Sequence, residues 1–140
     1  MPLTLTALVR VRSYELDSFG HVNNAVYLNY LEEARSNFLQ QLGLSFKDFR
    51  RLGVQLVIAE ANVRYRKPAY FGDEIEITGV FTPLKSVSLR IDYTLIEKQS
   101  GREIATAFTV GVFINPETGR PIRPPEEFAR AFGFALEEAP

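Results

Sequence analysis

The stretch DSFGHVNNAVY, residues 17–27, is rich in turn-forming residues and stands between a strand-like segment and a helix-like segment. Asp, Ser, Gly and Asn form turns readily, and Asn is also common as the N-cap of a helix. We therefore expect a loop over residues 15–24 that ends in a helix N-cap, with the helix beginning near Asn24.

The segments on either side of this loop have different hydrophobic periods. Over residues 3–11, apolar residues alternate with polar ones, which is typical of a half-buried strand. Over residues 25–42, apolar residues recur at steps of three and four, which predicts one long amphipathic helix closed by Gly43. The apolar stripe of this helix consists of Tyr27, Leu31, Ala34, Phe38 and Leu42.

The rest of the chain is dominated by strand-like runs. A short helix is expected over residues 45–51, with Ser45 as its cap, and another over residues 124–134. Between them, four strands are expected over residues 54–66, 74–82, 87–97 and 103–115, separated by Pro and Gly breaks. Short connections favour antiparallel pairing, so the sequence predicts one α+β domain, residues 1–140, with five strands wrapped round a central helix.

The first of these four strands has apolar residues at both odd and even positions. One helix covers only one face of a sheet, so we expect the other face to meet a second subunit, in a homodimer at least. The alternative is that the tail or a loop covers that face. The two expected faces are Val54, Leu56 and Ile58 on one side, and Val57, Ala59, Ala61 and Val63 on the other.

The composition excludes several classes of function. The 16 basic and 17 acidic residues leave a net charge of -1 and form no basic stripe, so nucleic acid is not an expected partner. The absence of cysteine excludes disulfides, thiolate metal sites and a cysteine nucleophile, and His21 is the only histidine. No signal-like or membrane-spanning segment is recognisable, so a cytoplasmic protein without a membrane partner is expected.

The loop before the long helix carries the groups with the most useful chemistry. The sequence lacks the motifs of serine hydrolases, zinc proteases and nucleotide-binding loops. Free N–H groups at a helix start can polarise a substrate carbonyl without a metal, and a nearby carboxylate can attack it or activate water. Asp17 is the carboxylate in this position, although an Asp before a helix is most often only a cap or turn residue.

Five stretches carry a resemblance to a known family. They are VRSYELD at residues 11–17, HVNNA at 21–25, LEEAR at 31–35, YRKPA at 65–69 and GD at 72–73, with Tyr27 in between. In this order they resemble hotdog-fold acyl-CoA thioesterases of the 4-hydroxybenzoyl-CoA thioesterase superfamily, and most of all the bacterial long-chain acyl-CoA thioesterases. The resemblance implies a hotdog fold, a homotetramer built as a dimer of dimers, and hydrolysis of acyl-CoA. It also implies no cofactor, since coenzyme A is part of the substrate.

The resemblance also implies roles for the loop residues. Asp17 takes the position of the catalytic carboxylate, either as a nucleophile that forms a mixed anhydride or as a base for water. Asn24 stands where the helix N-terminus offers a backbone N–H to the thioester oxygen, and Gly20 where the loop approaches that oxygen. His21 is grouped with Asp17 and Asn24 in catalysis, either positioning substrate or only holding the loop, and Asn23 shapes the site.

Residues outside the loop complete the expected site. Tyr27 is expected to pack its ring on the sheet with its hydroxyl hydrogen-bonded. Glu60 interrupts an apolar run, and an ion pair at an edge or interface explains it more simply than contact with substrate. The charges suited to the phosphates of coenzyme A, each of which alone is more often a surface charge, are Arg64, Arg66, Lys67 and Lys85.

The expected function is hydrolysis of medium- to long-chain fatty acyl-CoA at sites in a dimer interface, with the acyl chain between helix and sheet. Two alternatives stay open. The first is a non-catalytic acyl-binding module of the same fold, in which Asp17 is merely a cap. The second is a hydratase or dehydratase that acts on enoyl or hydroxyacyl thioesters. The carrier of the acyl group, coenzyme A or acyl carrier protein, also stays open.

Overall fold

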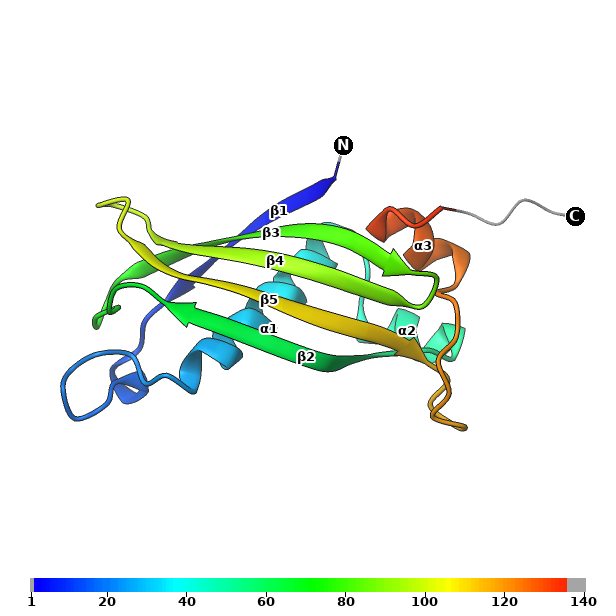
Figure 1. Cartoon of the computed structure of the whole chain (residues 1–140), viewed down its shortest axis with the longest axis horizontal. Helices are drawn as coiled ribbons and strands as arrows, with labels where there is room; N and C mark the ends of the chain where they lie inside the picture. The colour runs from blue at the N-terminus through cyan, green and yellow to red at the C-terminus, as the bar shows by residue number, and fades with distance from the viewer. Residues whose placement is uncertain (1, 136–140) are drawn as a thin grey trace, which may run out of the picture.

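The computed structural model describes residues 2–135, which form a five-stranded antiparallel sheet with a long helix across one face (Figure 1). The strand order is β1-β3-β4-β5-β2, so the first two strands of the chain form the two edges of the sheet. The strands are β1 (Leu3–Arg10), β2 (Gln55–Tyr65), β3 (Glu74–Lys85), β4 (Ser88–Glu97) and β5 (Glu103–Ile114).

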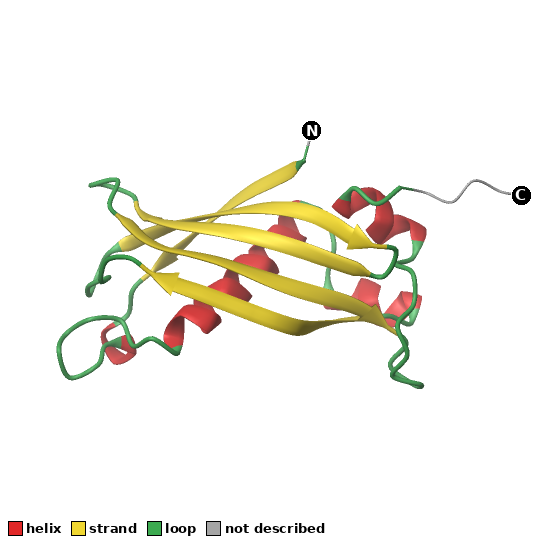
Figure 2. Cartoon of the chain, in the orientation of Figure 1, coloured by secondary structure: helices red, strands yellow, loops and turns green. Residues whose placement is uncertain are grey.

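The long helix α1 (Val26–Gln41) lies behind the sheet in Figure 2, and we call the face that it covers the inner face. Its buried stripe consists of Tyr27, Tyr30, Leu31, Ala34 and Phe38. The Phe38 ring presses so closely on the sheet that a Cβ atom at Gly79 would lie 2.6 Å from its Cε2 atom. Glycine at this point of β3 therefore lets the helix approach the sheet.

Three short helices complete the described fold. They are the 3-10 helix η1 (Ser13–Glu15), α2 (Phe46–Leu52) and α3 (Glu126–Phe132). In Figure 1, α2 and α3 lie at the end of the sheet away from the start of α1. None of the helices within residues 2–135 is long and apolar enough to cross a membrane.

The predicted α+β arrangement of five strands round a central helix is confirmed. Ser45 caps α2 as expected, in a capping box with Asp48. Gly43 and Gly53 follow the ends of α1 and α2 with positive φ. The predicted break at Pro83 is wrong, because β3 continues through this residue to Lys85, with a shift of register there. Residues 1 and 136–140 of the predicted domain lie outside the described part.

The predicted division of β2 into two faces is wrong beyond Ile58. A β-bulge shifts the register between Ile58 and Glu60, and a bulge reverses the alternation of side chains that follow it. Val63 therefore packs against the core on the same inner face as Leu56, while Val57 stays exposed. The outer face of β2 is thus more polar than the alternation predicted.

The predicted N-cap of α1 is also different. The helix begins at Val26 with Ala25 as its cap residue, and no side chain caps it. The Asn23 side-chain oxygen instead accepts a hydrogen bond from the Ala25 N–H at 2.9 Å. The Asn24 carbonyl accepts the Tyr27 N–H at 3.4 Å, whereas the Asn24 N–H has no acceptor within residues 2–135.

Candidate active site

The loop around Asp17, residues 16–25, which we call the Asp17 loop, is closed by hydrogen bonds of its own backbone. The Asp17 N–H donates to the His21 carbonyl at 2.7 Å, and the Gly20 N–H donates to the Asp17 carbonyl at 3.1 Å. Gly20 has a φ of 82°, in the left-handed region that favours glycine, which permits this tight turn. Asp17 is therefore held in a fixed turn rather than on a free loop tip.

The two oxygens of the Asp17 carboxylate have different surroundings. Oδ1 accepts the Phe19 N–H at 2.8 Å and the His21 N–H at 3.3 Å. No group within residues 2–135 donates a hydrogen bond to Oδ2. The first oxygen fixes the orientation of the carboxylate, and the second is left to act on a substrate or a water molecule.

Asp17 and His21 line a shallow pocket of about 220 Å³ at the start of α1, which we call the Asp17 pocket. The loop supplies one wall, the end of β2 and the segment after it supply the other, and Tyr27 lies between them. The remaining residues of the pocket are Val22, Asn24, Tyr65, Arg66, Lys67 and Pro68. The predicted residues Asp17, His21, Asn24, Tyr27, Arg66 and Lys67 are thus brought together.

The backbone N–H of Asn24 is the unpaired donor at this helix start. The Ala25 N–H is bound by the Asn23 side chain, the Val26 N–H donates to the Asn23 carbonyl, and the Asn24 N–H has no acceptor within the described residues. A helix start concentrates partial positive charge on such groups. The Asn24 N–H is therefore suited to an oxygen that becomes negative.

Two tyrosines make the apolar wall of the Asp17 pocket. The Tyr27 ring is buried and meets the Tyr65 ring edge-on, with centroids 5.1 Å apart. The Tyr65 hydroxyl donates to the Asn24 carbonyl at 2.8 Å, so β2 is tied to the helix start. Burial raises the pKa of the Tyr27 hydroxyl, which keeps it neutral. The predicted site lacked Tyr65, although it opens one of the resembling stretches.

A buried carboxylate lies beneath the loop, and the predicted site lacked it too. The Glu15 side chain accepts hydrogen bonds from the Arg12 N–H at 2.7 Å and from the Tyr30 hydroxyl at 2.9 Å. Its backbone carbonyl accepts the Asn23 N–H at 2.9 Å. Glu15 therefore joins both ends of the Asp17 loop to α1.

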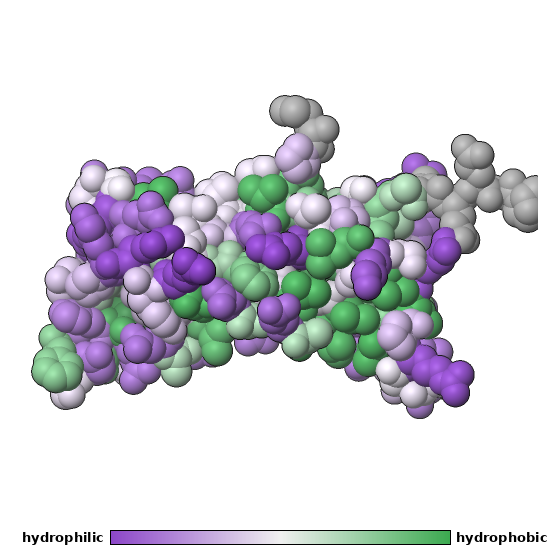
Figure 3. Space-filling view, in the orientation of Figure 1, coloured by the Kyte–Doolittle hydropathy of each residue, from purple (hydrophilic) through white to green (hydrophobic). Residues whose placement is uncertain are grey.

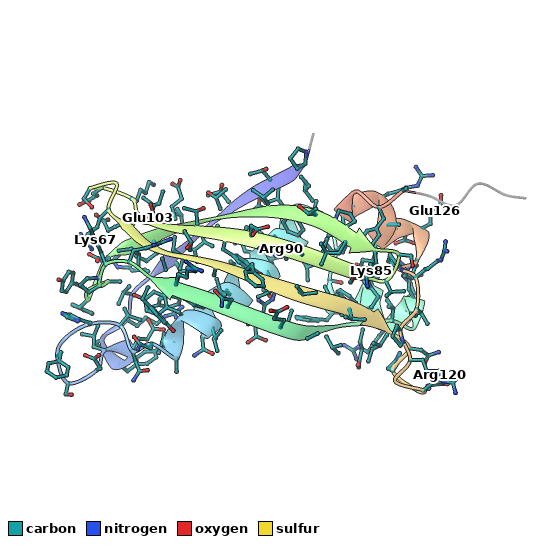
Figure 4. The ribbon with its side chains drawn as sticks, in the orientation of Figure 1. Lys67, Lys85, Arg90, Glu103, Arg120 and Glu126 are labelled. Carbon is teal, nitrogen blue, oxygen red and sulfur yellow. The ribbon has the colours of Figure 1, made fainter. Side chains whose placement is uncertain are left out.

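Three predicted residues lie away from the Asp17 pocket within one chain. Lys85 is at the opposite end of the sheet from Lys67 in Figure 4. Arg64 lines a depression of the outer face beside Arg90. Glu60 is exposed at the bulge of β2, and no ion pair to it forms within residues 2–135. Gly20 and Asn23 are also outside the lining of the pocket, but Gly20 shapes the turn after Asp17 and Asn23 the turn before α1, as described above.

A larger cavity of about 560 Å³ lies between α1 and the inner face of the sheet, and we call it the helix–sheet cavity. Its volume is within the usual range for small-molecule sites. Its deeper walls are apolar, and charged residues such as Arg12 and Glu33 stand at its rim. The apolar walls include Phe38, Leu56, Ile58, Phe81, Leu89, Ile91 and Phe132.

Comparison with known proteins identifies relatives of the whole domain. A family model described as "Thioesterase-like superfamily" matches residues 11–132. The chain is 34% identical over 110 residues to the long-chain acyl-CoA thioesterase FadM of Escherichia coli (strain K12), which covers 79% of this chain and 83% of that protein. It is 30% identical over 130 residues to the chloroplastic acyl-acyl carrier protein thioesterase ATL3 of Arabidopsis thaliana, which covers 93% of this chain and 68% of that protein.

A solved structure has the same fold. The 1,4-dihydroxy-2-naphthoyl-CoA thioesterase Slr0204 from Synechocystis superposes with a TM-score of 0.87 and covers 93% of this chain and 96% of that chain. The two sequences are 23% identical, so this likeness concerns the fold alone. It confirms the predicted hotdog arrangement.

Proposed function

Because the chain belongs to the thioesterase-like superfamily and is therefore a thioester hydrolase, we propose that it hydrolyses medium- to long-chain fatty acyl-CoA, with Asp17 as its catalytic carboxylate. The observation that carries this proposal is that one pocket holds both a carboxylate oxygen and an N–H group that lack hydrogen-bond partners within residues 2–135. A thioester carbonyl that binds between them meets a nucleophile or base on one side and an oxyanion donor on the other.

The reaction needs two complementary actions from these groups. The Asn24 N–H donates to the carbonyl oxygen and stabilises the negative charge that develops there. The Asp17 carboxylate takes a proton from a water molecule, whose oxygen attacks the carbonyl carbon, or attacks that carbon itself and is later released by water. In the first route, the C–S bond breaks after water has attacked, and Asp17 returns its proton to the leaving thiolate of coenzyme A. In the second route, the C–S bond breaks as the mixed anhydride forms, before water releases Asp17, and the thiolate takes a proton from solvent water. This chemistry requires no metal or prosthetic group.

The two ends of the substrate call for different surroundings. Arg66 and Lys67 are exposed cations at the rim of the Asp17 pocket, which suits the phosphates of coenzyme A. The helix–sheet cavity has the apolar walls and the volume that a fatty acyl chain needs. These features favour an acyl-CoA over a small polar thioester.

The active unit in this proposal is a homodimer joined along β2. This edge strand is exposed over most of its length, with Val57 38% and Ile58 41% exposed. If two copies pair antiparallel along it, the Tyr65 end of one β2 lies beside the Gln55 end of the other. The Asp17 pocket adjoins the first end and the helix–sheet cavity the second, so each active site would draw on both subunits.

The first test measures thiol release from acyl-CoA esters of short, medium and long chains by wild type and by Asp17→Asn. The substitution keeps the shape of the side chain but removes its charge, so we expect turnover to fall about 100-fold or more while the fold persists. The expected substrate preference is for the longer chains.

Asp92→Asn is the matched control, because Asp92 is a partly exposed carboxylate on β4 that pairs with Arg90. Its turnover should equal that of wild type. Full activity in Asp17→Asn would refute the role of Asp17. Binding of acyl-CoA without thiol release by wild type would indicate the non-catalytic module instead.

A further inference from the structure

The side chain of His21 is held by an aromatic ring from another part of the chain. The His21 and Tyr70 rings meet edge-on, with centroids 5.4 Å apart, and the two residues also form an isolated antiparallel bridge. Next to this bridge, the Val22 N–H donates to the Ala69 carbonyl at 2.9 Å. The segment 66–73, between β2 and β3, is therefore the support against which the Asp17 loop rests.

Tyr70 is itself fixed by Asp73. The Tyr70 N–H donates to Asp73 Oδ2 at 2.9 Å, and the Asp73 N–H donates back to the Tyr70 carbonyl at 3.1 Å. The Val11 N–H also donates to the Asp73 carbonyl at 2.9 Å. This closed turn presents the Tyr70 ring toward His21.

Arg102, at the β4–β5 turn, contacts both Tyr70 and Asp73. Its Nη2 donates to Asp73 Oδ2 at 2.7 Å, and its guanidinium carbon lies 5.4 Å from the centroid of the Tyr70 ring. The two charged side chains are only 25% and 21% exposed, so the ion pair is shielded from solvent. Salt screens a shielded pair less than a surface pair, so the attraction between Arg102 and Asp73 is stronger here.

The guanidinium keeps this orientation although it leaves a buried donor unpaired. Arg102 Nε is buried and has no hydrogen-bond partner within the described residues. An unpaired buried N–H is unfavourable, so other contacts must fix the plane of the group. The contacts available here are the Asp73 carboxylate and the Tyr70 ring.

We propose that Arg102 is a positioning residue for thioester hydrolysis, which acts through Asp73 and Tyr70 to fix the His21 ring and the loop that carries Asp17. This inference rests on the proposed function for its catalytic consequence. Its structural part, the orientation of His21, holds or fails independently of any activity. Arg102 does not line the Asp17 pocket, so it acts through Tyr70 rather than by contact with substrate.

The test exploits the fact that His21 is the only histidine of the chain. Its ring protons give a single set of NMR signals, whose position depends on the neighbouring Tyr70 ring. We expect Arg102→Gln and Tyr70→Leu to move these signals toward those of an unstructured histidine. Tyr70→Phe keeps the ring and should leave them unchanged.

The kinetic readout separates positioning from binding. Arg102→Gln should lower kcat about ten-fold with little change in KM, because a small displacement of reacting groups slows the chemical step. Asp73→Asn should have a similar effect, and Arg102→Lys should recover only part of the rate, because an ammonium cannot lie flat on the ring while it pairs with Asp73.

Arg90→Gln is the matched control, since Arg90 also lies over an aromatic ring, Phe108, and pairs with a carboxylate, Asp92, but on the outer face of the sheet. It should change neither the His21 signals nor kcat.

An unchanged His21 spectrum in folded Arg102→Gln and Asp73→Asn would overturn the positioning role of Arg102. A changed His21 spectrum with unchanged kcat would overturn the role of Arg102 in catalysis. A rise in KM alone would overturn it too, because it would mean that Arg102 binds the coenzyme A or acyl carrier protein part of the substrate. If wild type lacks activity, the proposed function fails while the spectra still decide the positioning.

Discussion

At the scale of single residues, the candidate site depends on two carboxylates with opposite surroundings. Asp17 is partly exposed, and one of its oxygens has no donor in the described part of the chain. The Glu15 side chain, in contrast, is 7% exposed and is bound by Arg12 and Tyr30. Burial and the hydrogen bond to Glu15 raise the pKa of the Tyr30 hydroxyl strongly, so Tyr30 stays a donor. The first carboxylate is arranged to react, and the second is arranged to hold the loop.

Glu15→Ala should lower the free energy of unfolding by about 1–3 kcal/mol, because it leaves a buried hydroxyl and a backbone N–H without their acceptor. Urea denaturation at neutral pH measures this change. Glu15→Gln should cost less, since both bonds end on Oε1 of Glu15 and the amide oxygen of glutamine can accept both. Equal stability of Glu15→Ala and wild type would show that water replaces the carboxylate.

At the scale of elements, the β4–β5 turn is held by the side chain of Glu97. Glu97 ends β4, and its carboxylate accepts the N–H groups of Gln99 at 3.0 Å and Ser100 at 2.9 Å. These backbone hydrogen bonds lower the pKa of the Glu97 carboxyl below its ordinary value. Arg102 lies at the end of the same turn, so these hydrogen bonds of Glu97 also help to position Arg102, the proposed positioning residue.

The lowered pKa of Glu97 predicts a loss of stability in acid. The Glu97 carboxylate binds a proton more weakly in the folded protein than in the unfolded chain. Its contribution to the free energy of unfolding is therefore complete above the ordinary carboxyl pKa of about 4.3, and it is lost as the pH falls through the lowered pKa of the folded state. Urea midpoints of wild type and Glu97→Gln should therefore differ at neutral pH and converge in acid. A constant difference across this range would contradict the prediction.

At the scale of the whole molecule, the two edges of the sheet differ in exposure. β1 buries Ala7 and Val9, whereas every residue of β2 is exposed or only partly buried. Hydrophobic side chains also gather on the outer surface of the sheet toward the end where α2 and α3 lie (Figure 3). A long exposed edge strand with apolar side chains favours association with another strand.

The mass of the protein in solution should therefore be a multiple of the 15.9 kDa chain. Lysine at both Val57 and Ile58 should give folded monomers with little turnover, because charges would be buried along the paired edge and the shared site would be lost. Light scattering coupled to size exclusion measures the mass. Leu8→Lys, at the other edge and 51% exposed, should stay oligomeric; a monomeric wild type would contradict the prediction.

The sequence by itself determined the order and type of the elements, because the periods of two and of three to four residues report directly which side chains face the core. It also located Asp17, His21, Asn24 and Tyr27 in one place, since these residues are neighbours in the chain and a turn followed by a helix start keeps them together. The family resemblance rested partly on this loop and partly on the stretches at residues 31–35, 65–69 and 72–73.

Only the tertiary structure decided the contacts that come from distant segments. Tyr65, Tyr70 and Arg102 reach the Asp17 loop through the pairing of strands, which local propensity does not encode. The bulge at Ile58 and Glu60 reversed the expected faces of β2, because one unpaired residue shifts the phase of all that follow. The position of Lys85 at the far end of the sheet followed from strand order, which depends on packing the whole sheet round α1.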